Sequence, residues 1–144
     1  MSDVLTLSQI KMPGTARSKN DAIRETGEIL VDVGAVTPAY IDSMFDRERS
    51  VSTYMGNYLA IPHGTNESKE SIKRSALSVV RYVEPIDWDG NQVLFALGIA
   101  GYQGGHMDIL SRIAIVFSDT DEVDKLVAAG SAQEIYDLLN AVNE

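Results

Sequence analysis

"QVLFALGIA", residues 92–100, is apolar along nearly its whole length and predicts a strand that is buried on both faces of a sheet. "ALSVVRYV", residues 76–83, is rich in β-branched residues and predicts a second strand. Between these strands, "EPIDWDGNQ" at 84–92 carries turn chemistry. A shorter apolar run at 58–61 predicts a third strand, which stops where Pro62 removes a backbone donor.

Helical signals precede these strands. Ser18 and Asp21 form a capping-box-like start for a segment with an apolar face, and Gly34 is expected to end that helix as its C-terminal cap. Thr37 as N-cap and Pro38 at the first helical position predict a second helix, which runs out near the charged "DRER" stretch.

Further helical signals follow the strands. Apolar residues repeat at helical spacing over 109–117, and Thr120 is expected to cap a short helix that Gly130 closes. Ser131 and Glu134 form a capping box for a last helix. Strands interleaved with helices predict an α/β fold, a mixed β-sheet flanked by helices on both faces.

The composition limits the function classes. The 144 residues fit one domain, 1–144, and no apolar run reaches the about 18 residues that a membrane span needs. A formal charge of −9, from 21 acids against 12 bases, argues against a nucleic-acid partner. The start of the chain has no signal-peptide pattern, and the absence of cysteine excludes disulfides, so we expect a cytoplasmic protein.

The usual cofactor and nucleophile motifs are absent from the sequence. It has no GxxxxGK[ST] phosphate loop, no GxSxG elbow and no dinucleotide fingerprint, since "GYQGG" at 101–105 lacks the glycine spacing. The two histidines lie far apart, with no spacing that points to a metal site. No cofactor and no metal are therefore predicted.

The stretch "YLAIPHGT", residues 58–65, places His63 between a proline and a glycine at the end of a predicted strand. An imidazole with a pKa near ~6.5 is substantially neutral, and so nucleophilic, at cytoplasmic pH. Gly64 lets backbone amides come close to an attached group, and Thr65 with Asn66 could start a short helix whose free amides receive an anion. The alternative is a surface-turn histidine without a role.

Two further residues are candidates. His106 follows a glycine pair at a predicted helix start, where the helix dipole disfavours the imidazolium form. It is either a neutral donor to an anion or a tolerated polar residue of the first turn. Arg47 could hold a phosphoryl oxygen or belong to a solvated charged turn, and the sequence does not say whether Arg47 or Arg49 points inward.

Together these residues resemble the type-2 enzyme IIA domains of the bacterial phosphoenolpyruvate-dependent sugar phosphotransferase system, and most of all the mannitol branch. "DRERSVSTYMGNYLAIPHGT" at 46–65 and "GIAGYQGGHMDILSRIAIVFSD" at 98–119 carry the likeness, and the flanking helices continue it. The "IDWDG" loop at 86–90 also resembles the mannitol branch more than the nitrogen-regulatory branch, which shares the "IPHG" core.

The resemblance implies a phosphotransferase that works through a phosphohistidine. His63 would accept a phosphoryl group from HPr, as a tele-phosphohistidine candidate, and pass it to a cysteine of enzyme IIB, or of a IICB protein, for mannitol uptake. His106 would be the second active-site histidine and Arg47 the arginine that helps to hold the group. Asn57 stands where mannitol-type members can carry a glutamate, and an amide supplies neither negative charge nor a base.

Partner proteins must reach such a site, so an apolar rim is expected around it. Met55, Tyr58, Tyr102 and Met107 are its expected members, with ordinary core packing as the alternative for each. Three other functions remain open at this point: a regulatory enzyme IIA of the nitrogen type, a protein-binding module in which His63 is inert, and a metal-dependent hydrolase that uses both histidines.

Overall fold

The sheet at the centre of the molecule is mixed. The computed structural model describes residues 4–102 and 105–143, without the side chains of residues 66, 67, 106 and 141. Within that part of the chain, five strands lie in the order β1-β4-β5-β3-β2. They are β1 (Ile10–Lys11), β2 (Tyr54–Gly56), β3 (Leu59–Ala60), β4 (Ala76–Trp88) and β5 (Asn91–Ala100). The β4–β5 and β2–β3 pairs are antiparallel, whereas β1–β4 and β3–β5 are parallel.

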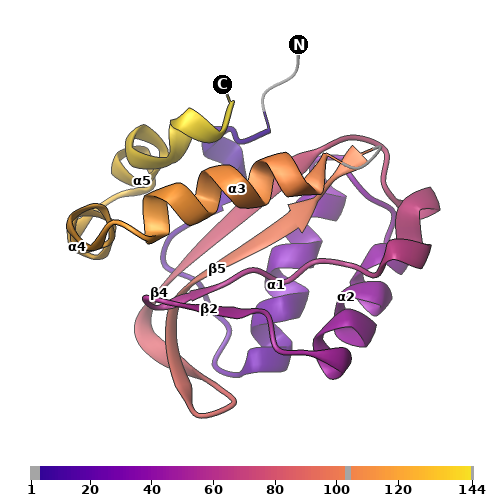
Figure 1. Cartoon of the computed structure of the whole chain (residues 1–144), viewed down its shortest axis with the longest axis horizontal. Coiled ribbons are helices and arrows are strands. Elements are labelled where there is room, and N and C mark those ends of the chain that lie inside the picture. The colour runs from indigo at the N-terminus through magenta and orange to yellow at the C-terminus, as the bar shows by residue number, and fades with distance from the viewer. Residues whose placement is uncertain (1–3, 103–104, 144) are drawn as a thin grey trace.

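Helices cover both faces of this sheet, which confirms the predicted α/β architecture (Figure 1). On one face lie α1 (Lys19–Asp32) and α2 (Ala39–Ser50). On the other lie α3 (His106–Phe117), α4 (Thr120–Ala128) and α5 (Ala132–Leu139). Short 3-10 turns occupy Leu7–Gln9, Asn66–Ser71 and Asn140–Asn143. Among the described helices, none combines the length and the apolar character needed to cross a membrane.

Side chains of the two longest strands, β4 and β5, alternate between two hydrophobic cores, one on each face of the sheet. Leu77 and Val79 of β4 point into the core beneath α3, α4 and α5, whereas Ala76 and Val80 point into the core beneath α1 and α2. This alternation follows from the two-residue period of a strand. Because both faces are covered, β5 is buried from Val93 onward, as its unbroken apolar run predicts.

The predicted ends of α1 are confirmed. The Ser18 hydroxyl accepts a hydrogen bond from the Asp21 amide at 3.2 Å, which caps the first turn. At the other end Gly34 has a φ of +77°, and the Ala35 amide reaches back to the Leu30 carbonyl at 3.0 Å. This is a Schellman cap, which a glycine forms without steric cost.

The prediction of a long turn at 84–92 is wrong. β4 continues to Trp88, and the turn is confined to Asp89 and Gly90, whose φ values are +55° and +93°. An Asp-Gly pair with positive φ suits a two-residue hairpin. The other turn-like residues lie in an irregularity of the β4–β5 ladder between Arg81 and Ile86, where the register shifts.

Two predicted helix starts are displaced by one residue. α2 begins at Ala39, with Pro38 in helical geometry as its cap position and no side-chain capping bond. The cap of α4 is Asp119, not Thr120, and its carboxylate accepts the Asp121 amide at 3.0 Å. A carboxylate is favoured there because it also meets the positive end of the helix dipole. The predicted capping of α5 is confirmed, since the Ser131 hydroxyl accepts the Glu134 amide at 3.2 Å.

A buried carboxylate in the middle of α1 ties this helix to the sheet and to the segment before the helix. Glu25 is 7% exposed, accepts hydrogen bonds from the Thr15 amide and hydroxyl and from Tyr82, and pairs with Lys11 at 2.7 Å. Burial is the largest single effect and by itself would raise its pKa. The hydrogen bonds and the lysine together outweigh burial and lower the pKa of Glu25 from its usual 4.5 to about 2.

This depressed pKa predicts a pH-dependent contribution to stability. The unfolded chain binds the proton more tightly than the folded one, so the contribution of Glu25 is complete above 4.5 and is lost as the pH falls towards about 2. We expect the difference in unfolding free energy between wild type and Glu25→Gln to shrink over that interval in urea titrations. A difference that stays constant with pH would contradict this assignment.

Candidate functional site

His63 lies just beyond the carboxyl end of β3, at the same sheet edge where β5 ends. The Ile99 amide donates to the Pro62 carbonyl at 3.0 Å, and His63 forms a parallel bridge with Ile99. Because β3 and β5 are parallel, the chain leaves both strands at this edge, and the segment after β5 leads into α3, whose first residue is His106. The carboxyl edge of parallel strands is where α/β proteins commonly bind ligands.

A hydrogen bond fixes which nitrogen of the His63 ring carries the proton. Nδ1 lies 2.8 Å from the Ile61 carbonyl oxygen. A carbonyl can only accept, so Nδ1 carries the proton and Nε2 keeps its lone pair in the neutral ring. The side chain is half-buried. The arrangement therefore presents Nε2 as the nucleophilic atom.

Tyr40 of α2 holds the backbone on the other side of His63. Its hydroxyl accepts the Gly64 amide at 2.9 Å and donates to the Ile99 carbonyl at 2.7 Å. Burial raises the pKa of Tyr40 to about 12, although the bond from the Gly64 amide acts in the opposite direction. The phenol therefore stays protonated at neutral pH and serves as donor and acceptor at once.

Close contact with α2 explains the glycine after His63. A Cβ atom at Gly64 would lie 2.5 Å from both Tyr40 Cε1 and Ser43 Oγ. We expected Gly64 to bring a backbone amide to a group attached to His63, but that amide is donated to Tyr40. The role of this glycine visible in the structure is thus close packing against α2.

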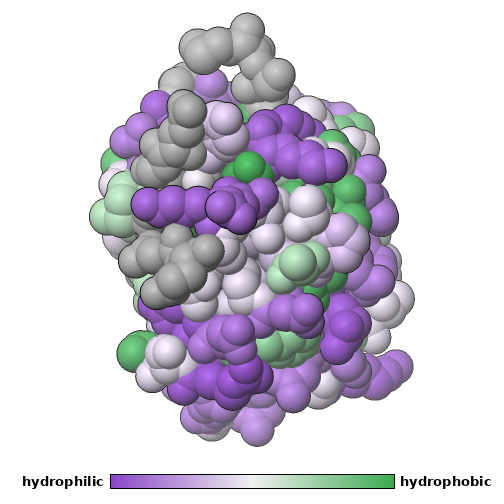
Figure 2. Space-filling view, turned by 90° about the vertical axis from the view of Figure 1, so that its right-hand side faces the viewer, coloured by the Kyte–Doolittle hydropathy of each residue, from purple (hydrophilic) through white to green (hydrophobic). Residues whose placement is uncertain are grey.

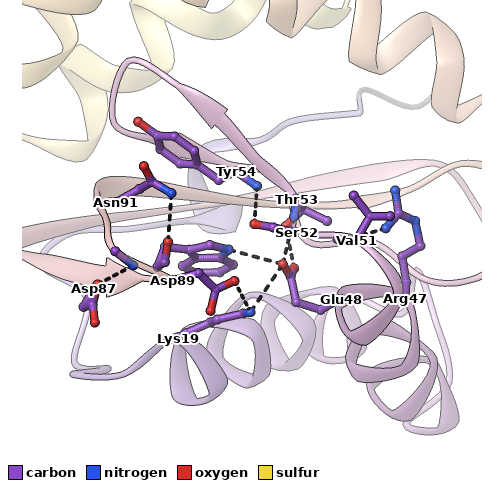
Figure 3. Close-up of polar contacts among 12 residues, drawn as sticks. Lys19, Arg47, Glu48, Val51, Ser52, Thr53, Tyr54, Asp87, Asp89 and Asn91 are labelled. Atoms are coloured by element: carbon purple, nitrogen blue, oxygen red, sulfur yellow. Dashed lines mark hydrogen bonds and ion pairs between the residues drawn. The ribbon is translucent and has the colours of Figure 1, made fainter.

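Arg47 lies on the same face of α2 as Tyr40 and Ser43, because spacings of three and four residues align on a helix. The residue is half-buried, and its guanidinium donates to the Val51 carbonyl at 2.8 Å in an exposed hydrogen bond (Figure 3). Arg49 instead pairs with Asp46, and its side chain is 71% exposed. The structure therefore favours Arg47 over Arg49 as the arginine on the side of the His63 turn.

The backbone of His106 begins α3, as predicted, with Gly105 at the cap position. Its side chain lies outside the described part of the structure, so its expected role stays a prediction. The helix expected after Thr65 is instead a 3-10 turn over Asn66–Ser71, interrupted at Ser68, whose hydroxyl donates to the Thr65 carbonyl at 2.6 Å. This turn does not provide the α-helical N-terminus expected as an anion receptor.

Asn57 lies at the far end of α3 from His106. Its side-chain amide donates to the Phe117 carbonyl at 2.7 Å, in the last turn of the helix. At a rise of about 1.5 Å per residue the two ends of α3 are roughly 16 Å apart. The amide of Asn57 thus caps the C-terminus of α3. This structural contact explains the side chain, and no role in the chemistry is needed.

The four residues expected in an apolar rim are all exposed, so the alternative of core packing is wrong for each. Their exposed fractions are 52% for Met55, 41% for Tyr58, 45% for Tyr102 and 59% for Met107. Tyr102 and Met107 flank the start of α3, whereas Met55 and Tyr58 lie in the β2–β3 hairpin, which reaches the C-terminal end of α3 through Asn57. They therefore do not form one ring around His63. In Figure 2, which faces the right-hand end of Figure 1, hydrophilic residues cover much of the surface.

The sequence patterns did not reveal two residues of α2: Tyr40, which binds the Gly64 amide, and Glu48, which binds Thr53. Tyr40 and Glu48 are both buried. The only signal for Tyr40 was its spacing from Arg47, and Glu48 was hidden inside a run of charges that is typical of a solvated face.

Comparison with known proteins gives one family. The family described as "Phosphoenolpyruvate-dependent sugar phosphotransferase system, EIIA 2" matches residues 3–142. The mannitol-specific phosphotransferase enzyme IIA component of Halalkalibacterium halodurans is 50% identical over 141 residues, covering 98% of this chain and 97% of that protein. The component of the same name from Staphylococcus aureus strain Mu50 is 50% identical over 135 residues, 94% of each chain.

Solved structures agree with this match. The Escherichia coli complex of enzyme IIA for mannitol with phosphorylated enzyme IIB gives a TM-score of 0.89 at 28% identity, covering 95% of this chain and 97% of that one. The crystal structure of Escherichia coli IIA mannitol gives 0.86 at 30% identity, covering 94% and 98%. The nitrogen regulatory protein IIA-Ntr of Neisseria meningitidis gives 0.78 at 27% identity, covering 94% and 96%.

The Tyr40 hydroxyl gives a direct test of how the His63 turn is held. Tyr40→Phe removes the acceptor of the Gly64 amide and the donor to the Ile99 carbonyl. We expect the unfolding free energy to fall by about 1–3 kcal/mol, because buried partners are left unpaired. Chemical denaturation measures this. The control Tyr102→Phe, at an exposed site, should stay within about 0.5 kcal/mol of wild type. Equal stability of the two variants would argue against the bridge.

Proposed function

Because the chain belongs to the type-2 enzyme IIA family of the phosphoenolpyruvate-dependent sugar phosphotransferase system, we propose that it is the phosphoryl carrier of a mannitol-specific system, with His63 as the phosphorylated residue. It takes the group from phospho-HPr and delivers it to enzyme IIB, or to the B domain of a IICB protein. Residues 1–144 act as a single domain of this family, in the cytoplasm, where both partners work. The hydrogen bond between His63 Nδ1 and the Ile61 carbonyl is the observation that carries the proposal.

Because of that hydrogen bond, no proton has to be removed from His63 during the transfer. The Nε2 lone pair attacks phosphorus, an N–P bond forms, and the N–P bond of phosphohistidine in HPr breaks with its electron pair returning to HPr. Since Nδ1 already holds the ring proton, His63 needs no base. In the onward transfer, the cysteine thiolate of enzyme IIB attacks phosphorus, an S–P bond forms, and the N–P bond breaks with its electron pair returning to Nε2. Positioning and charge stabilisation therefore provide most of the catalysis.

Arg47 and His106 are proposed to stabilise the phosphoryl group in transit. A guanidinium offers several donors in a plane that matches phosphoryl oxygens, and Arg47 lies on the α2 face that packs against the His63 turn. His106 begins α3, where the positive end of the helix dipole favours an anion and a neutral imidazole can donate one hydrogen bond. A protein with a net charge of −9 needs such local cations and donors to hold a phosphoryl group.

The mannitol assignment rests on the relatives. The proteins that are 50% identical over nearly the whole chain are called mannitol-specific, whereas the nitrogen regulatory structure is 27% identical. A regulatory carrier is the second candidate, since it would share the phosphohistidine. Rescue of mannitol uptake in a strain that lacks its own enzyme IIA distinguishes the two functions.

Phosphorylation can be tested by intact-mass spectrometry after mixing the protein with enzyme I, HPr and phosphoenolpyruvate. We expect one acid-labile phosphoryl adduct that is absent in His63→Ala, because the acceptor nitrogen is gone. His106→Ala should still form the adduct, at a rate lower by up to about 100-fold, the scale for losing one stabilising donor. Normal phosphorylation of His63→Ala would refute His63 as the acceptor, and no adduct on wild type with active partners would refute the carrier function. The second result would favour a protein-binding module.

The neighbouring arginines provide a matched pair. Arg47→Gln should slow phosphorylation by about 10- to 100-fold, because a cation near the phosphoryl group is lost. Arg49→Gln removes the same charge from an exposed side chain that pairs with Asp46, so its rate should match wild type. Single-turnover transfer from phospho-HPr measures both. Equal slowing in the two variants would indicate a general effect of charge, not a specific role of Arg47.

A further inference from the structure

Glu48, directly after Arg47, is a buried carboxylate that ties the end of α2 to the chain leading into β2. It is 6% exposed. Its Oε2 accepts the Thr53 amide at 2.8 Å and its Oε1 accepts the Thr53 hydroxyl at 2.6 Å, so both oxygens grip one residue (Figure 3). We call this arrangement the Glu48–Thr53 clasp.

Further partners offset the cost of burying the charge of the clasp. The Trp88 indole donates to Oε2 at 3.3 Å, and Lys19 Nζ lies 3.8 Å from the same oxygen while pairing with Asp89 at 2.7 Å. Figure 3 shows the Lys19 amine of α1 between the carboxylates of Glu48 and of Asp89, which lies at the tip of the β4–β5 hairpin. A buried charge with this many partners holds its neighbours in one geometry, since losing any of them leaves an unpaired group.

The clasp connects to His63 through two hydrogen bonds to backbone carbonyls. The carbonyl of Thr53 accepts the Ile61 amide at 3.1 Å. The carbonyl of Ile61 accepts the Nδ1 proton of His63 at 2.8 Å. Ile61, whose carbonyl orients the imidazole, is therefore held by Thr53, and Thr53 is in turn bound by Glu48.

The clasp connects to Arg47 on its other side. Arg47 is the residue before Glu48, and its guanidinium donates to the carbonyl of Val51 at 2.8 Å. Val51 lies two residues before Thr53, on the short segment that the clasp closes against the end of α2. The positions of Arg47 and His63 thus both depend on hydrogen bonds to the backbone segment 51–53, directly for Arg47 and through Ile61 for His63.

We propose that Glu48 is a positioning residue for phosphoryl transfer, which sets the guanidinium of Arg47 relative to Nε2 of His63 through its clasp on Thr53. The inference rests on the proposed function. Glu48 touches none of the reacting atoms, and it acts through the segment 51–53 and through Ile61. Transfer is sensitive to such positioning, because small misplacements of reacting groups cost large factors in rate.

The protein contains a matched control for this idea. Glu25 is buried to the same degree and also grips one threonine by both its amide and its hydroxyl, Thr15, at 2.9 and 2.8 Å. Its other partners include Tyr82 of β4 and Lys11 of β1. Among the described contacts, none of these partners of Glu25 bonds directly to the segment 51–53 or to Ile61. Changes at the two clasps therefore compare like chemistry, with and without a connection to the site.

The test compares Thr53→Val with Thr15→Val, each of which removes a hydroxyl while keeping the β-branched shape and the backbone amide. Single-turnover transfer from phospho-HPr is measured over a range of HPr concentrations. We expect kcat to fall by about 10-fold in Thr53→Val with KM unchanged, because chemistry is misaligned while the docking face is intact. Thr15→Val should stay within about 2-fold of wild type. Thr53→Ser, which keeps the hydroxyl, should restore kcat.

Two measurements separate positioning from loss of structure. Urea unfolding compares the stabilities of the two valine variants, and ¹⁵N NMR of the His63 ring reports its tautomer in the folded, unphosphorylated protein. A shifted tautomer balance in Thr53→Val and in the milder Glu48→Gln, with wild-type signals in Thr15→Val, supports the proposal. Equal kcat and equal ring signals in both valine variants would overturn it. Failure of wild type to form any phosphohistidine would instead refute the proposed function itself.

Discussion

The parallel pairing of β3 with β5 is the constraint on which the site depends. Leu59 pairs with Phe95 and Ala60 with Ala96, and the pairing extends past the strand through the Ile99 amide and the Pro62 carbonyl. An antiparallel pairing would have sent the two chain ends to opposite edges of the sheet. With parallel strands, the turn that carries His63 and the segment that enters α3 leave the sheet together.

α2 then acts as the rigid element that spans the site. Near its start, the Tyr40 hydroxyl fixes the backbone after His63, and near its end Glu48 fixes the segment that supports the backbone before it. Arg47 lies between these two anchors on the same helix. A helix holds such spacings far more tightly than a loop, which suits a reaction that relies on geometry and charge instead of acid-base chemistry.

Local patterns in the sequence predicted most of the secondary structure. The apolar run of β5, the serine caps of α1 and α5 and the glycine after α1 each depend on neighbouring residues, so they could be recognised without the fold. The hairpin was misjudged because Glu84 and Pro85 resemble turn residues, yet they lie in an irregular stretch of a strand whose ends are held by pairing with β5. Tertiary pairing there outweighs local propensity.

The functional site, like the fold, could be predicted only in part from the sequence. His63 could be found from its proline and glycine neighbours, and the likeness to a known family pointed to Arg47 and His106. The proton on Nδ1 depends on the conformation of the turn, since its acceptor Ile61 lies only two residues before His63. The bridge made by Tyr40 and the burial of Glu48 require contacts between residues far apart in the sequence. Asn57 stands where mannitol-type members can carry a glutamate, and its amide, to which the sequence analysis gave no catalytic role, closes the far end of α3.

The most direct test of the central claim is to determine which nitrogen of His63 carries phosphorus. Protein labelled with ¹⁵N in histidine and phosphorylated through HPr would be examined by NMR for coupling between phosphorus and the ring nitrogens. The hydrogen bond from Nδ1 to the Ile61 carbonyl predicts phosphorus on Nε2, with the Nδ1 proton retained. Phosphorus on Nδ1 would require that hydrogen bond to break and would contradict the account.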